Sequence, residues 1–87
     1  MNAKQQKTLN LLFTDPVSPS IKWSDIESCL ISLGAVITEG RGSRARVNLN
    51  GERAVFHRPH PDANTDKGAV KSVRKFLLNA GVKNDDV

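Results

Sequence analysis

The feature that most constrains the fold is the dipeptide Asn50-Gly51, which separates two runs of alternating apolar and polar residues. The first run extends from Ser43 to Leu49 and the second from Glu52 to Arg58. Asparagine and glycine both tolerate the positive φ angles of a type I′ turn, so this dipeptide between alternating runs is a strong signal for a β-hairpin. We therefore predict two antiparallel strands joined by a two-residue turn.

A two-residue turn also fixes which residues lie opposite each other. Val47 then faces Ala54 and Ala45 faces Phe56, and this mostly apolar set belongs against a helical layer. The intervening pairs project from the other face; they are Asn48 with Arg53, Arg46 with Val55, and Arg44 with His57. A register shifted by one residue would bury three arginines and expose Phe56, so the pattern supports this pairing.

The remaining elements follow from helical periodicity and from residues that end helices. We predict a helix from Ala3 to Thr14, which Asp15-Pro16 ends because the residue before proline disfavours helical geometry. Ser24 and Glu27 have the spacing of a capping box for a second helix, which ends at Gly34. A first strand over residues 35–38 and a final helix over residues 66–80 complete the order. These elements predict an α+β fold, a two-layer sandwich with helices on one sheet face and the other face open.

The length of 87 residues allows one small domain. We divide it into an N-terminal helix and linker (1–20), an α-β-β-β-α domain (21–82) and a polar tail (83–87). A single cysteine, Cys29, excludes an internal disulfide and a cysteine-based zinc site, and no third ligand accompanies His57 and His60, so we expect no metal or cofactor. No apolar run is long enough to span a membrane or to form a signal peptide, and we expect a cytoplasmic protein.

Positive charge is concentrated in the second half of the chain. The whole chain carries a net charge of +4, whereas residues 41–75 contain nine basic and three acidic residues. Such a basic region implies an anionic partner, either nucleic acid or an acidic protein surface. The alternative is a solvated basic surface that has no specific partner.

The predicted open face brings several of these basic residues together. It carries Arg44, Arg46, Arg53 and His57, and the final helix adds a stripe formed by Lys67, Lys71, Arg74 and Lys75. Arginine presents a planar fork to phosphate oxygens, and lysine adds a less directional charge. The chain has no tyrosine and Phe56 is predicted to point inward, so we expect RNA to be bound through its phosphates rather than by aromatic stacking.

The string GRGSRARVNLNGERAVFHRPHP, followed by a basic helix that ends in FLLNAG, resembles the HicA family. The resemblance covers about Ile21 to Gly81, and the helix before it resembles an addition to the minimal family member. HicA proteins are toxins of type II toxin–antitoxin pairs with a double-stranded-RNA-binding-domain-like fold. The resemblance implies an endoribonuclease that cuts messenger RNA without a metal and is neutralised by a HicB-like antitoxin.

One position departs from the family pattern. The family has its catalytic histidine directly after Gly-Ser, and here Gly42-Ser43 is followed by Arg44. His60 matches the terminal His-Pro of the family, which is not the usual catalytic position. The predicted register places His57 opposite Arg44, so we hypothesise that His57 is the general base and Arg44 the phosphate clamp. Ser43 either binds phosphate through its hydroxyl or bonds to the backbone.

Two further functions stay open at this point. The absent family histidine makes a non-catalytic RNA-binding module of the same fold credible. A basic face that docks an acidic protein is the third possibility. RNA cleavage distinguishes the first function from the second, whereas added salt weakens binding to nucleic acid and to acidic proteins alike.

Overall fold

The structure is a computed structural model that describes residues 1–59 and 62–83. Its elements are α1 (Ala3–Leu12), α2 (Trp23–Ser32), β1 (Val36–Glu39), β2 (Arg44–Leu49), β3 (Glu52–His57) and α3 (Lys67–Asn79). The strands form an antiparallel sheet in the order β1-β2-β3. The predicted α+β order is confirmed, including the additional N-terminal helix.

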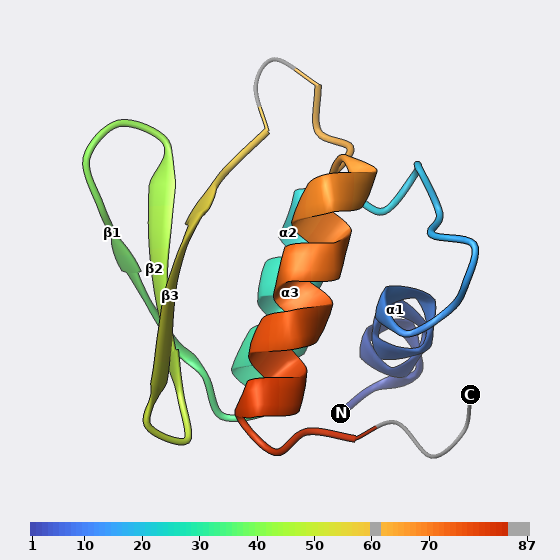
Figure 1. Cartoon of the computed structure of the whole chain (residues 1–87), viewed down its shortest axis with the longest axis horizontal. Helices are drawn as coiled ribbons and strands as arrows, with labels where there is room; N and C mark the ends of the chain where they lie inside the picture. The colour runs from blue at the N-terminus through green and yellow to red at the C-terminus, as the bar shows by residue number, and fades with distance from the viewer. Residues whose placement is uncertain (60–61, 84–87) are drawn as a thin grey trace.

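The elements are arranged in layers (Figure 1). Helices α2 and α3 lie on the same side of the sheet, with α3 in front of α2 in this view, and α1 lies on the side of these two helices away from the sheet. Helix α1 packs on both α2 and α3 through Leu9 and Leu12, which are buried. The predicted sandwich of sheet and helices is therefore present, with α1 as an outer layer, and the sheet face away from the helices is uncovered.

The hairpin has the predicted turn and register. Asn50 and Gly51 have φ angles of 52° and 84°, as a type I′ turn requires. Val47 lies opposite Ala54, and Phe56 lies opposite Ala45. Phe56 is 8% exposed and Val47 2% exposed, so this row faces the helices as predicted. The Phe56 ring lies 5.8 Å from the rings of both Trp23 and Phe76, which joins β3 to the two covering helices.

The turn is also attached to a helix. The Asn50 side-chain amide donates a 2.9 Å hydrogen bond to the carbonyl of Ala80, the residue that caps the C-terminus of α3. This bond satisfies a helix-end carbonyl that has no partner within its own helix. It also connects the hairpin turn directly to the helical layer.

The N-terminal end of α3 agrees with the sequence prediction, whereas that of α2 differs. The Asp66 side chain accepts a 2.7 Å hydrogen bond from the Ala69 backbone and caps α3, which begins one residue later than predicted. The predicted capping box of α2 is wrong, because Lys22 is the N-cap and makes no side-chain cap bond. Ser24 already lies inside the helix, and the Glu27 side chain accepts hydrogen bonds from Trp23 and Arg58.

Three smaller predictions can be compared with the fold. Cys29 is buried in the core, as its place on the apolar stripe of α2 predicts, and burial raises the pKa of its thiol to about 11. Within residues 1–59 and 62–83, none of the helices combines the length and apolar character needed to cross a membrane. Residues 84–87 of the predicted tail lie outside the described residues.

Candidate functional site

The open face of the sheet carries the predicted row of polar side chains. Along β2 the exposed residues alternate strictly with buried ones, so Arg44, Arg46 and Asn48 face solvent. Their partners on β3 are His57, Val55 and Arg53 in that order, and all three are exposed. The structure therefore brings together the four basic or imidazole side chains that the register predicted for this face.

Arg44 and His57 approach each other more closely than average cross-strand neighbours. The Ser43 carbonyl accepts a 2.9 Å hydrogen bond from the Arg58 backbone, which makes Ser43 and Arg58 a hydrogen-bonded pair. The next pair, Arg44 and His57, is consequently a non-hydrogen-bonded pair, in which the two Cα atoms are about 4.5 Å apart and the side chains are closer. The imidazole and the guanidinium therefore share one small region of surface.

A glycine-containing loop borders this pair. Arg41, Gly42 and Ser43 line a surface hollow of about 440 Å³ together with Arg44 and His57. Gly40 directly precedes this loop in the chain, and its backbone N–H donates a 2.9 Å hydrogen bond to the Arg44 carbonyl. A Cβ atom at Gly40 would lie 3.0 Å from the Arg44 Cβ, so a side chain here would force Arg44 to shift by a few tenths of an ångström. The hollow is large enough for a phosphate group and part of its nucleotide.

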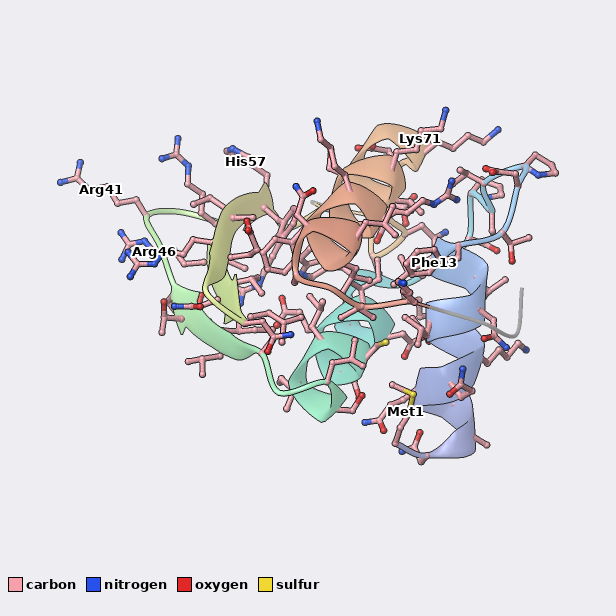
Figure 2. All side chains as sticks on the ribbon, turned by 60° about the horizontal axis from the view of Figure 1, so that its bottom comes forward. Met1, Phe13, Arg41, Arg46, His57 and Lys71 are labelled. Atoms are coloured by element: carbon pink, nitrogen blue, oxygen red, sulfur yellow. The ribbon has the colours of Figure 1, made fainter. Side chains whose placement is uncertain are left out.

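Helix α3 contributes further positive charge. Lys67, Lys71 and Lys75 are exposed along one side of this helix. Figure 2 shows that Lys71 and His57 project towards the same side of the molecule, whereas Arg41 and Arg46 project beyond the sheet. Lysines of α3 therefore lie on the helical side of His57, and arginines lie on its sheet side.

The predicted exposed position of Arg74 is wrong. Its side chain is only 18% exposed and lies between α3 and the segment that follows α1. Its guanidinium donates to the carbonyls of Leu12 (2.6 Å) and Thr14 (3.0 Å), and it pairs with the Asp15 carboxylate at 3.1 Å. Arg74 connects α1 to α3, so its charge is not available on the surface of α3.

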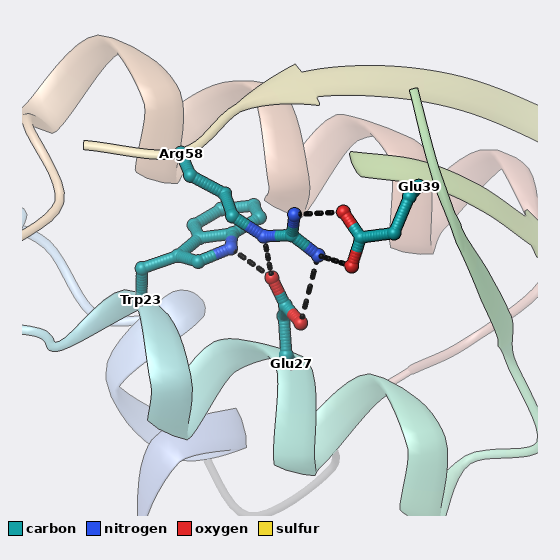
Figure 3. Close-up of polar contacts among 4 residues, drawn as sticks. All are labelled: Trp23, Glu27, Glu39 and Arg58. Atoms are coloured by element: carbon teal, nitrogen blue, oxygen red, sulfur yellow. Dashed lines mark hydrogen bonds and ion pairs between the residues drawn. The ribbon is translucent and has the colours of Figure 1, made fainter. Parts of the chain in front are cut away.

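Arg58, one of the nine basic residues between 41 and 75, connects the end of the sheet to helix α2 (Figure 3). Arg58 follows β3 and pairs with Glu27 of α2 at 2.8 Å and with Glu39 of β1. Glu27 also accepts a hydrogen bond from the Trp23 indole. The hydrogen bond from Arg58 lowers the pKa of Glu39, and the same contacts raise the pKa of Arg58. This cluster fixes the end of β3 next to His57.

These two ion-pair clusters define which charges stay available. Of the nine basic residues between 41 and 75, Arg58 and Arg74 are neutralised by carboxylates of the same chain. For the other seven, no ion pair exists within the part of the chain that the structure describes. They are Arg41, Arg44, Arg46, Arg53, Lys67, Lys71 and Lys75. The free charge therefore lies on the open face, on the loop before it and on α3.

The two histidines considered as metal ligands are His57 and His60. Among the described residues, no three side chains of the types His, Cys, Asp or Glu are grouped so that they could hold a metal ion. His60 lies outside the described residues, and so does the terminal His-Pro of which it is part.

A second hollow on the open face was not predicted as a site. It has a volume of about 600 Å³ and lies over the middle of the sheet between Arg46 and Arg53. Two exposed valines, Val36 and Val55, form much of its apolar lining, and Asn48 lies among them. The register already placed Val55 on this face, but the position of Val36 depended on the pairing of β1, which no turn dipeptide fixes.

The comparisons with known proteins give one match. The family model described as "HicA toxin of bacterial toxin-antitoxin" matches residues 23–82, which include both hollows and the elements from α2 to α3. Neither a curated protein nor a solved structure matches the chain.

Proposed function

The chain belongs to the HicA toxin family of bacterial toxin–antitoxin systems, and on this basis we propose that it is a metal-independent endoribonuclease that cuts messenger RNA. The observation that carries the proposal is the exposed cross-strand pair of Arg44 and His57 beside the 440 Å³ hollow. It supplies an imidazole that can act as a base and a fixed positive charge within reach of one phosphate group.

In the proposed reaction, the neutral imidazole of His57 removes the proton from a ribose 2′-hydroxyl. The 2′-oxygen then forms a bond to the neighbouring phosphorus, and the bond from phosphorus to the 5′-oxygen breaks. The 5′-oxygen leaves with a proton taken from water, so the products are a 2′,3′-cyclic phosphate and a 5′-hydroxyl end. Arg44 stabilises the charge that develops on the phosphoryl oxygens, and a positioned base contributes about 10²–10⁴-fold to the rate.

The substrate would be held mainly through its phosphates. Arg46 and Arg53 extend the positive charge along the open face, while Lys67, Lys71 and Lys75 extend it along α3. Ser43 lines the 440 Å³ hollow beside Arg44 and His57, where its hydroxyl can donate to a phosphate oxygen. Among the described side chains of the open sheet face there is no Phe or Trp, and Trp23, Phe56 and Phe76 are buried, which agrees with recognition of the RNA backbone.

We propose a HicB-like antitoxin as the protein partner. An antitoxin that covers the free basic surface would block access of RNA to His57, and an acidic segment would match its charge. Because the substrate is messenger RNA, the proposal places the toxin in the cytoplasm.

A second candidate function is RNA binding without cleavage. It is favoured by Arg44, which occupies the position where the family resemblance implies a histidine. The same surface would then hold RNA through its phosphates and cover it without breaking a bond.

Cleavage assays distinguish these functions. Purified protein is incubated with a long RNA in the presence of EDTA, and the products are analysed for new 5′-hydroxyl ends. We expect such ends with the wild type and their loss with His57→Ala, and expression of the same pair in cells should show growth arrest and transcript loss for the wild type alone. RNA that stays intact at high protein concentration would favour the binding module, and undiminished toxicity of His57→Ala would eliminate His57 as the base.

A further inference from the structure

The hollow over the middle of the open face has the properties of a base-binding subsite. Its volume of about 600 Å³ lies within the range of pockets that hold small molecules, about 300–1,000 Å³. Val36 and Val55 are 61% and 54% exposed, and both line this hollow. We propose that this hollow binds one nucleobase of single-stranded RNA; the inference rests on the proposed function and names a specificity site for it.

The lining of the hollow supports a nucleotide as the occupant. Val36 on β1 and Val55 on β3 lie on either side of the central strand β2, so they form two apolar sides of the hollow between which a base can lie. Arg46 lies on the central strand between Thr38 and Val55, and Arg53 lies on β3 beside Asn48. Both guanidinium groups therefore line the hollow and can bind phosphates next to that base. Asn48 contributes an amide that has both a donor and an acceptor, which suits the mixed hydrogen-bonding edge of a base.

The distance from the catalytic pair supports the same occupant. The Arg46–Val55 pair is the next pair on the open face after Arg44–His57, two residues further along the hairpin. This separation corresponds to about 7 Å along the strands. An RNA strand whose reacting phosphate lies at Arg44 would therefore place a neighbouring nucleotide over Val55. The identity of that nucleotide would then influence where the RNA is cut.

The test compares oligomers with and without bases. Single-stranded RNA pentamers carrying 2′-O-methyl groups cannot be cleaved by attack of the 2′-oxygen, so their affinity is measured by fluorescence anisotropy without loss of substrate. An abasic oligomer of equal charge serves as the reference. Wild-type protein should bind the base-containing pentamer about fivefold more tightly than the abasic one, through apolar contact with the valines.

The double variant Val36→Thr/Val55→Thr should lose this preference and bind both oligomers alike. Threonine has nearly the same shape as valine and suits a strand, and both positions are exposed, so the fold is expected to be kept. Ile31→Thr on α2, at a position that is 59% exposed, is the matched control and should keep the fivefold preference. Asn48→Ala should bring the affinities for the four homopolymer pentamers closer together.

Equal preference in the wild type and the double variant would overturn the subsite, even if RNA cleavage is observed. No binding of any pentamer by the wild type would also overturn it. A double variant that loses affinity only for a purified HicB-like antitoxin would assign the hollow to the protein partner and overturn it as well. Base-dependent binding in a wild type that cleaves nothing would keep the subsite and refute the proposed reaction.

Discussion

At the scale of single residues, the main feature of the proposed site is that its histidine lies on β3, opposite the position on β2 where the family resemblance implies one. The family resemblance implies a histidine where this chain has Arg44, and His57 lies directly opposite on β3. Because the pair is of the non-hydrogen-bonded type, the two side chains occupy neighbouring surface regions whichever strand carries which. The proposed mechanism therefore implies that an imidazole on either strand could reach the same phosphate.

This reasoning predicts the result of an exchange. The double variant Arg44→His/His57→Arg should regain at least a tenth of the wild-type cleavage rate, whereas His57→Arg alone should lose about 100-fold or more. The rates are measured on one RNA of defined sequence at saturating concentration. Exchange and single variants that are equally inactive would show that the catalytic geometry is not interchangeable between the two strands.

The sequence could predict these positions because they depend on local signals. Asn50-Gly51 and the alternation around it fix the register of the hairpin, and the register fixes the partners of Arg44 and Arg46. Arg74 was misplaced for the opposite reason. Its spacing on α3 indicated an exposed stripe, but its partners at Leu12 and Asp15 come from the other end of the chain. Local spacing contains no information about such contacts.

At the scale of elements, the position of His57 depends on how the end of β3 is held. Arg58 connects this end to α2 through Glu27 and to β1 through Glu39. Glu27 was predicted to cap α2, and it instead accepts hydrogen bonds from Trp23 and Arg58. The sequence shows a carboxylate three residues after a serine, but it cannot show that a more distant arginine competes for that carboxylate.

The Arg58–Glu39 contact predicts a pH-dependent contribution to stability. The folded pKa of Glu39 lies below its ordinary value of 4.5, so the contribution is present above that pH and is lost as the pH falls through the lower, folded value. Denaturant unfolding should show wild type more stable than Glu39→Gln at pH 7, with the difference shrinking below pH 4.5. A difference that stays constant from pH 7 to pH 3 would contradict this account.

At the scale of the whole molecule, α1 is an integral layer of the fold. Leu12 is fully buried, and Arg74 bonds to the backbone at the end of this helix. Leu12→Ala should therefore reduce the free energy of unfolding by about 2–5 kcal/mol, as expected for a truncated core residue. Denaturant titration measures this change, and a loss below about 1 kcal/mol would show that α1 is only loosely attached.

The distribution of free charge also belongs to this scale, and it separates two residues that the sequence grouped together. Lys71→Ala should weaken RNA binding and reduce the dependence of log K on log salt by about 0.7, the value for one phosphate contact on a single strand. Arg74→Ala should instead lower stability and leave this salt dependence unchanged. Lys7→Ala, an exposed lysine on α1, is the matched control. Equal effects of Lys71→Ala and Arg74→Ala on the salt dependence would contradict the assignment of Lys71 to RNA binding and of Arg74 to stability.

The most direct test of the central claim measures RNA affinity and cleavage on the same preparation of His57→Gln. Glutamine keeps a polar side chain of similar size, but it cannot take a proton from a ribose hydroxyl at neutral pH. We predict an affinity for single-stranded RNA within about twofold of the wild type, and a cleavage rate at saturating RNA lower by about 100-fold or more. Cleavage by His57→Gln at the wild-type rate would show that the base is another group.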